Sequence, residues 1–179
     1  MFERPTLLPT AQRLFAYWLD MVLAFSVLGG VQALLAMTVG FPSWDGFGQN
    51  AWLLEGWVLL TISAPTWIYF IISDVHGGAT VGKRLLGLRV ELAAGGRVSV
   101  KQALGRTAIK LLPWEISHVA VMLPTPLLLP ETIPTIGQNA GLFIANMAIV
   151  IYVAGLVADR GVRALHDRVM ATQVVRLKG

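Results

Sequence analysis

No cysteine occurs in the sequence, so disulfide bonds and thiolate chemistry are excluded. Charged residues are also scarce: they make up 13% of the 179 residues, about half of the share that soluble domains carry. With 55% of the residues hydrophobic, these scarcities exclude a disordered chain and a disulfide-rich secreted domain, and they argue against an ordinary soluble enzyme. An integral membrane protein remains, provided that the hydrophobic residues form long uninterrupted segments.

The hydrophobic residues do form such segments. Residues 21–39 contain no charged side chain, residues 51–73 contain only Glu55, and residues 132–158 again contain none. A helix needs about 20 such residues to cross the hydrocarbon of a bilayer, where its backbone groups must bond to one another. The pattern predicts membrane-spanning helices at about 14–39, 51–73 and 135–158.

A fourth segment, residues 116–130, is short and contains three prolines, which resist helix continuation. The positions of the cations decide how to interpret it. All 14 Lys and Arg residues fall within residues 4–13, 83–110 and 160–178. Because cations stay on the cytoplasmic side, a crossing at about 111–129 that loses its helicity near Pro124 puts all of them there. We therefore expect four spans of the inner (plasma) membrane, with both termini in the cytoplasm.

Residues 74–110 form a polar, basic segment that is expected on the cytoplasmic surface. A short surface helix near 80–88 precedes a strand at 89–92, a turn at Gly95-Gly96 and a returning strand at 98–100. Ser99 then caps a helix that runs to Leu112 and is stopped by Pro113. Four cations are expected to contact anionic lipid headgroups: Lys83, Arg84, Lys101 and Arg106.

These elements predict an all-α integral membrane protein. Its fold is a four-helix transmembrane bundle with a short basic cytoplasmic segment between the second and third helices. The tail, residues 159–179, is also cytoplasmic, and residues 1–179 form a single membrane domain. Four short helices enclose little space, so we expect a homo-oligomer.

Asp20 is the only acidic residue that lies clearly inside a predicted span rather than near its end. Arg13 lies on the same helix face, roughly 10 Å away along the axis. A carboxylate at this depth is costly and functional by default, so the pair predicts an ion or proton site. The alternative is a structural pair, in which Asp20 bonds to Arg13, to a cation of another helix or to a backbone group.

Other polar residues of the spans favour packing. Asn139 and Asn146 could line a polar seam with Asp20 and Gln32, but hydrogen bonds between helices explain them as well. The second interpretation is preferred, because Gly137, Gly141 and Ala145 form a ridge of small residues on the same helix, which favours close packing.

Three further patterns argue against an enzyme or a metal protein. Glu115 and His118 have the E-x-x-H spacing of metal-binding bundles, but the second copy is absent, so a buried, hydrogen-bonded His is preferred and a proton relay is the alternative. Gly77–Lys83 matches the start of a P-loop, but Arg84 stands where Ser or Thr is required. With no nucleophile and base pair, we expect no enzyme activity, metal or cofactor.

Three motifs resemble those of the RDD family of membrane proteins, which is named for one Arg and two Asp residues. The motifs are QRLFAYWLD at 12–20, TVGKRLLGLRV at 80–90 and ALHDR at 164–168, the last followed by Ala171-Thr172 and Val174-Val175. Their order and spacing fit from residue 12 to residue 176. The resemblance implies that Arg13, Asp20 and Asp167 are the family's Arg and two Asp residues, with Asp74 as a competing candidate for the second Asp.

Two interpretations of Asp167 stay open. In the first, Asp167 pairs with Arg163 or with a cation of the middle segment and ties the tail down. In the second, it belongs to a cytoplasmic gate beside Asp20. The interpretation in which Asp167 ties the tail down, as part of a surface turn without further function, is the preferred one.

The resemblance implies transport, the role usually suggested for the family. We expect movement of an ion or small solute, with cation/proton antiport as one form, Asp20 as the carrier and Arg13 as its partner. Asp167, Asn146 and Asp74 are the other candidate ion-binding residues. The alternative is a non-transporting assembly, scaffold or lipid-interacting protein in which Arg13 and Asp20 are structural. The expected partners are the bilayer, anionic headgroups and a proton or monovalent cation, but no nucleic acid.

Overall fold

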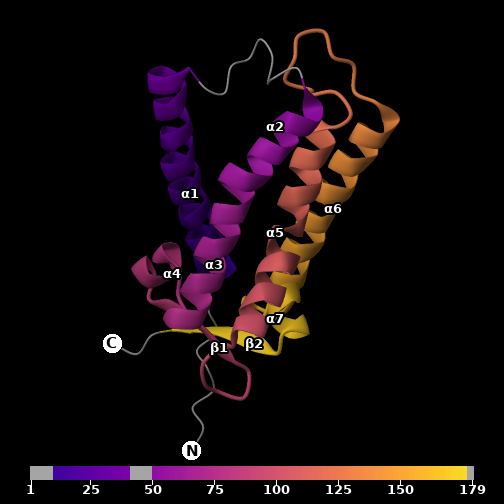
Figure 1. Cartoon of the computed structure of the whole chain (residues 1–179). Coiled ribbons are helices and arrows are strands. Elements are labelled where there is room, and N and C mark those ends of the chain that lie inside the picture. The colour runs from indigo at the N-terminus through magenta and orange to yellow at the C-terminus, as the bar shows by residue number, and fades with distance from the viewer. Residues whose placement is uncertain (1–9, 41–49, 177–179) are drawn as a thin grey trace, which may run out of the picture. The chain divides into compact units, whose positions relative to one another are not determined.

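A computed structural model of the chain describes residues 10–40 and 50–176, so Arg4, Asp45 and Lys178 lie outside the described residues. The described chain is mostly helical (Figure 1). Its elements are α1 (Thr10–Val39), α2 (Ala51–Val58), the π-helical turn η1 (Leu59–Ser63), α3 (Ala64–His76), α4 (Val81–Leu85), β1 (Leu88–Leu92), α5 (Val100–Met122), α6 (Ile136–Ala158), α7 (Leu165–Val169) and β2 (Thr172–Arg176).

Three helical stretches of the described chain are long and apolar enough to cross a membrane: Thr10–Val39, Ala51–His76 and Ile136–Ala158. They coincide with the three spans predicted from hydrophobic segments. The count of four spans is not confirmed, because α5 carries Lys101, Arg106, Lys110 and Glu115. Helix α5 joins the helix predicted from Ser99 to Leu112 and the first part of the predicted third span into one continuous element.

The prediction that Pro113 stops a helix is wrong, since α5 continues through it to Met122. A proline has no N–H and therefore leaves the carbonyl four residues earlier without its helical donor. That carbonyl belongs to Ile109, and it accepts a hydrogen bond from the Tyr152 hydroxyl at 2.6 Å. The helix ends close to Pro124, as the sequence indicated.

The predicted strand at 89–92 is confirmed, but its predicted partner is wrong. Strand β1 pairs antiparallel with β2 in the tail, with Val90 opposite Val174 (Figure 1). Residues 98–100 form no strand in the described chain; Ser99 instead caps α5, as predicted. Its hydroxyl accepts from the Gln102 N–H at 3.3 Å, and its own N–H donates to the Gln102 side chain at 3.1 Å.

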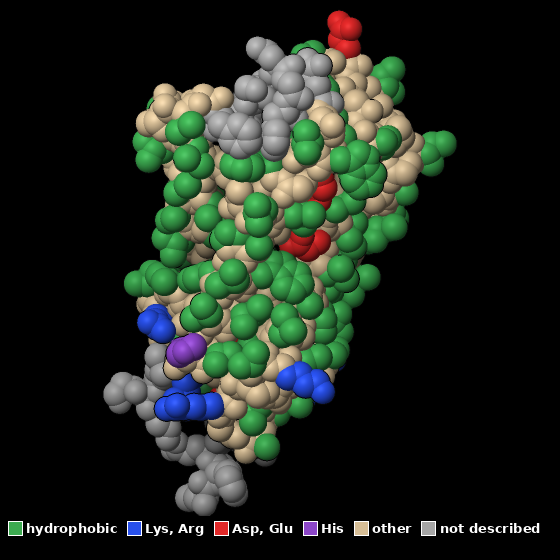
Figure 2. Space-filling model, in the orientation of Figure 1, with side chains coloured by type: hydrophobic (Ala, Val, Ile, Leu, Met, Phe, Trp, Pro, Cys, Tyr) green, Lys and Arg blue, Asp and Glu red, His purple; other side chains and the backbone are tan. Residues whose placement is uncertain are grey.

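The chain divides into two compact units, each assembled from separate segments. The first combines residues 1–23, 67–110 and 150–179, and the second combines residues 24–66 and 111–149. All 14 Lys and Arg residues of the sequence fall within the first, which we call the cationic unit, and none falls within the second, the cation-free unit. On the face shown in Figure 2, the Lys and Arg side chains accordingly gather over segments of the cationic unit.

Each unit has its own buried hydrophobic cluster. In the cationic unit, the cluster is Ala16, Leu88, Val90, Val98, Ala103 and Val174. In the cation-free unit, Leu54 and Val58 pack with Met122, and Gly141 of α6 lies so close to Ala120 that a Cβ on it would be 2.7 Å from the Ala120 side chain. Large apolar side chains on α1 and α6 remain exposed, which suits a lipid-facing surface.

Candidate functional site

Arg106 lies at the centre of the most unusual feature of the cationic unit. It projects from α5, is 1% exposed, and binds two buried carboxylates at once. Its Nε lies 3.2 Å from Asp74 at the end of α3, and its Nη1 contacts both Asp167 and Thr172. A guanidinium presents its donors in a planar fork, which allows one side chain to bridge two acidic groups.

Asp167 binds a second cation, Arg13, through its other carboxylate oxygen. Its Oδ2 lies 2.5 Å from Arg13 of α1 and also accepts the Ala164 N–H at the start of α7. Arg13 donates further to the carbonyls of Gly161 and Val162, at 3.1 and 2.7 Å. Asp167 therefore ties the tail to a cation of the middle segment, as one of the two interpretations predicted, and to α1 as well.

Lys83 completes a chain of alternating charges, because its Nζ lies 2.9 Å from Asp74. We call these five side chains the ion network: Arg13, Asp167, Arg106, Asp74 and Lys83. The network joins α1, α3, α5, the start of α4 and the tail. Buried charges of this kind are tolerated only when each finds partners of the opposite sign.

Asp20 lies in the same unit but is held in a different way. It is 1% exposed and accepts three hydrogen bonds, from the Tyr69 hydroxyl at 2.7 Å, the Thr80 hydroxyl at 2.5 Å and the Gly82 N–H at 2.7 Å. The predicted pair of Arg13 and Asp20 is therefore wrong. The two groups lie about two helical turns apart, and each finds nearer partners on other segments.

The TVGKR motif has a structural reason in this arrangement. Thr80 caps α4 and uses its hydroxyl to bind Asp20. Gly82 packs so tightly against α1 that a Cβ would collide with the carbonyl oxygen of Ala16. Lys83 then reaches Asp74, and Arg84 donates to the Ala79 carbonyl at 3.1 Å. The motif thus anchors the middle segment to the cytoplasmic-side end predicted for the first span.

Two neighbouring residues of the tail have displaced pKa values. Burial alone would raise the pKa of Asp167, but Arg106 and Arg13 hold it well below its usual range. Burial lowers the pKa of His166 to about 3, and Arg106, Lys110 and Arg13 add to this effect while Asp167 opposes it. Asp167 is thus held as an anion and His166 as a neutral side chain.

The predicted lipid contacts change accordingly. Arg106 is buried in the ion network, so its predicted contact with headgroups is wrong. Lys83 is directed toward Asp74. Arg84 and Lys101 are exposed and keep the positions that the prediction requires.

The polar seam proposed for the spans is not formed as such. Asn146 is exposed and donates to the carbonyl of Leu142 on its own helix. Gln32 instead binds Thr61 at 2.7 Å and Trp57 at 2.9 Å, so it joins α1 to the second span within the cation-free unit. These contacts agree with packing as the role of the polar residues.

The cation-free unit contains a second buried cluster of ionisable groups. His118 is 5% exposed, and its Nε2 lies 2.7 Å from Glu115 while its Nδ1 lies 3.0 Å from Glu55 of α2. Ser63, in the π-helical turn, lies 3.3 Å from the same Nε2. The preferred interpretation of His118 as a buried, hydrogen-bonded residue is confirmed. The described residues include no group of side chains suited to a metal ion.

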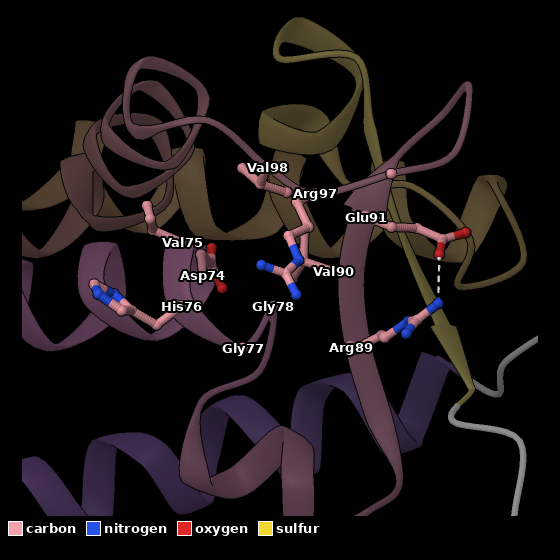
Figure 3. A pocket seen from close by; sticks show the side chains of 11 residues that line it. Asp74, Val75, His76, Gly77, Gly78, Arg89, Val90, Glu91, Arg97 and Val98 are labelled. Atoms are coloured by element: carbon pink, nitrogen blue, oxygen red, sulfur yellow. Dashed lines mark hydrogen bonds and ion pairs between the residues drawn. The ribbon is translucent and has the colours of Figure 1, made fainter.

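A pocket of about 250 Å³ opens on the cationic unit (Figure 3). The end of α3, strand β1 and residues 96–98 line it, and the Arg97 side chain extends into it between Val98 and Gly78. Arg89 at the rim is paired with Glu91 at 3.2 Å. The pocket is polar and open, and it lies apart from the side chains that form the ion network except for Asp74.

Sequence reasoning missed three of the residues that form these clusters. Arg106 was assigned to the surface, although Ala103, Arg106 and Thr107 share one face of α5 and are all buried. Tyr69, which donates to Asp20, was not among the predicted site residues. Glu55 carried the clearest signal, because it is the only charge in the second predicted span.

The long apolar helices define a helical membrane protein with an ion network at one set of helix ends. The model of the RDD family matches residues 8–171, which is nearly the whole chain, and the chain belongs to that family. No curated protein and no solved structure matches it.

Proposed function

We propose that this protein is a multi-pass protein of the inner (plasma) membrane that moves an ion or a small solute across it. Cation/proton exchange is one form of this activity. The observation that supports it is the burial of Asp20 and the ion network in a chain with so few charges. Ionisable groups at membrane depth are expensive, and by default they mark ion or substrate pathways.

In this function, the ion network closes the cytoplasmic side of the path along which the ion or solute moves. Arg13 and Asp20 both lie on α1, and each is held by a different part of the chain: the tail holds Arg13, and residues 80–82 hold Asp20. A closure of this kind opens when charged side chains exchange partners together. Asp20 accordingly serves to hold the closed state rather than to carry the ion.

A second candidate function is a non-transporting assembly, scaffold or lipid-interacting protein. The observation that favours it is that, among the described residues, buried Asp20 accepts its hydrogen bonds from the neutral donors Tyr69, Thr80 and Gly82. A carboxylate satisfied in this way has a sufficient structural role, since it fixes α1 to the middle segment. The exposed Arg84 and Lys101 suit anionic headgroups in either case.

Ion and proton flux in proteoliposomes separates these proposals. We expect the wild-type protein to move at least one monovalent cation or protons faster than protein-free vesicles do. Asp20→Asn keeps the shape of the side chain and weakens its hydrogen bonds, so flux is expected to persist or to increase. Abolished flux in this variant would return the carrier role to Asp20. Absence of flux for every tested ion would favour the assembly.

The proposed topology has its own test. We propose four spans, with the third formed by the apolar end of α5 and the residues up to about 129, and both termini in the cytoplasm. Accessibility tags at Asp45 and Glu131 are expected to label from outside the cell. A cytoplasmic position for either tag contradicts the four-span arrangement. Cross-linking in native membranes tests the proposed homo-oligomer.

A further inference from the structure

The cluster of Glu55, Glu115 and His118 has an unusual balance of protons. Both ring nitrogens of His118 face carboxylate oxygens, at 2.7 Å from Glu115 and 3.0 Å from Glu55. A neutral imidazole donates from one nitrogen only, and its other nitrogen repels a carboxylate unless a proton lies between them. At least two protons must therefore be shared among the three groups. They sit either both on His118, or one on His118 and one on a glutamate.

Either arrangement leaves the cluster with one negative charge. An imidazolium with two carboxylates sums to −1, and so does a neutral imidazole with one carboxylic acid and one carboxylate. The cation-free unit has no Lys or Arg anywhere in its sequence to balance this charge. A net charge that is buried away from water is costly, and a titratable group removes it by taking up a proton.

Glu55 is the group best placed to take that proton. It is 4% exposed, and its Oε2 lies 3.1 Å from His118 Nδ1, within hydrogen-bond distance. Within the described chain, Oε1 accepts no well-formed hydrogen bond although it lies 3.0 Å from the same nitrogen. Glu115 is more exposed, with 20% of its side-chain surface accessible. Trp114 packs beside the imidazole, with ring centroids 5.7 Å apart, and screens that side from water.

The backbone beside the cluster is also irregular. The second span is interrupted by the π-helical turn η1, which carries Ser63 toward His118. Single π-helical turns inside α-helices are frequent at functional sites, because they redirect a side chain and loosen the local hydrogen-bond ladder. Ser63 can donate to or accept from Nε2, so it can follow a change in the proton positions.

We propose that Glu55, Glu115 and His118 form a proton-binding site in the cation-free unit, and that Glu55 takes up a third proton, which makes the cluster neutral. The proton comes from a hydronium ion of the solvent: one of its O–H bonds breaks and leaves water, and a new O–H bond forms on a carboxylate oxygen of Glu55. Among the described residues, His118 of α5 contacts the Glu55 carboxylate, and Glu115 of α5 and Ser63 of η1 contact the other ring nitrogen of His118. The binding stands by itself, whereas its use as a step of ion movement rests on the proposed function.

Infrared difference spectroscopy of the full-length protein tests the binding directly. Between alkaline and mildly acidic pH, we expect a new carboxylic acid C=O band in the wild-type protein. The band is expected to be absent in Glu55→Gln and present in Glu131→Gln, a matched variant at an exposed acid of the same unit. A wild-type protein without the band, or a Glu55→Gln protein that retains it, would overturn the proposal.

Thermal stability gives a second measurement. Glu55→Gln imitates the protonated side chain, so it is expected to melt at the same or a higher temperature than the wild type at alkaline pH. In a merely structural ion pair, removing the charge leaves the imidazolium short of a partner and lowers the melting temperature at every pH. That second result contradicts the proposal even if the infrared bands overlap.

Added cations separate a proton from a metal ion as the occupant. Sodium, potassium and lithium are each added at constant pH while the infrared band is followed. An unchanged band supports proton binding, and a band that disappears with one cation overturns it in favour of a cation site. In proteoliposomes, Glu55→Gln is expected to lose pH-dependent flux. If the wild-type protein shows the infrared band but no flux, the transport function is rejected and the proton-binding site is kept.

Discussion

The two units of the chain balance their buried charges by opposite means. In the cationic unit, Arg106 and Arg13 neutralise Asp167 with permanent charges, because a guanidinium does not lose its proton in a protein. In the cation-free unit, Glu55 and Glu115 both contact the imidazole of His118, a side chain whose charge is exchangeable. The difference indicates that the first unit is built to hold one arrangement and the second to change its protonation.

The largest expected effect comes from removing the permanent cation at the centre of the ion network. Arg106→Gln leaves Asp74 and Asp167 buried with too little positive charge, so the free energy of unfolding is expected to fall by about 3–5 kcal/mol. The measurement is the melting temperature in detergent. Lys101→Gln, at an exposed position of the same helix, is the control and is expected to change stability by no more than about 0.5 kcal/mol. Equal melting of the two variants would show that the network contributes nothing to stability.

The second effect tests how closely the segments of the cationic unit are fitted together. Gly82→Ala places a methyl group against the carbonyl oxygen of Ala16 and disturbs the N–H bond to Asp20. We expect a loss of about 1–3 kcal/mol, the usual cost of overpacking. Gly56→Ala in the cation-free unit meets no atom within 4 Å, and it should be neutral or stabilising because alanine favours helix.

The sequence could predict local features of the fold and of the site, but not the contacts between distant segments. Long apolar segments revealed the three apolar helices, and the motifs around Arg13, Thr80 and Asp167 pointed to residues that lie in or beside the ion network. These signals are local. The partners of those residues were not predicted, because the choice between Arg13 with Asp20 and Arg13 with Asp167 depends on segments about 150 residues apart.

The errors have the same origin. Strand β1 was paired with the nearest candidate, residues 98–100, whereas its actual partner β2 lies about 80 residues away. Pro113 was interpreted as a stop, although the tertiary contact from Tyr152 to the Ile109 carbonyl lets the helix continue. In both cases a long-range contact outweighed a local preference, which is common where tertiary packing stabilises an element.

The third prediction concerns pH and the neutral state of His166. Its pKa is lowered to about 3 by burial and nearby cations, against about 6.5 in an unfolded chain. Above pH 6.5, the His166 side chain is neutral in both the folded and the unfolded chain. As the pH falls from 6.5 toward 3, the unfolded chain binds a proton that the folded chain does not, so stability decreases.

Between pH 7 and pH 5, we therefore expect the wild type to lose on the order of 1–2 kcal/mol of stability relative to His166→Gln, a comparison in which any proton uptake by Glu55 cancels. Asp167 does not contribute in this range, since its pKa is lowered and an unfolded Asp titrates near 4. His76→Gln, at an exposed histidine of the same unit, is the control and should retain the slope. If the pH dependence of the melting temperature survives in His166→Gln but disappears in His76→Gln, the pH response belongs to the exposed His76 and the prediction is wrong.

The smallest expected effect compares helix caps, one from each unit. Ser99 caps α5 in the cationic unit, and Asn50 caps α2 in the cation-free unit, where its side chain accepts the N–H groups of Trp52 and Leu53 at 3.1 Å. Replacement by alanine removes one local acceptor, so Ser99→Ala and Asn50→Ala should each cost about 1 kcal/mol. Because caps are local, the two losses should be equal although the units differ in charge. A markedly larger loss for Asn50→Ala would mean that the start of α2 also holds Glu55 in position, and the infrared band of Glu55 should then shift in this variant.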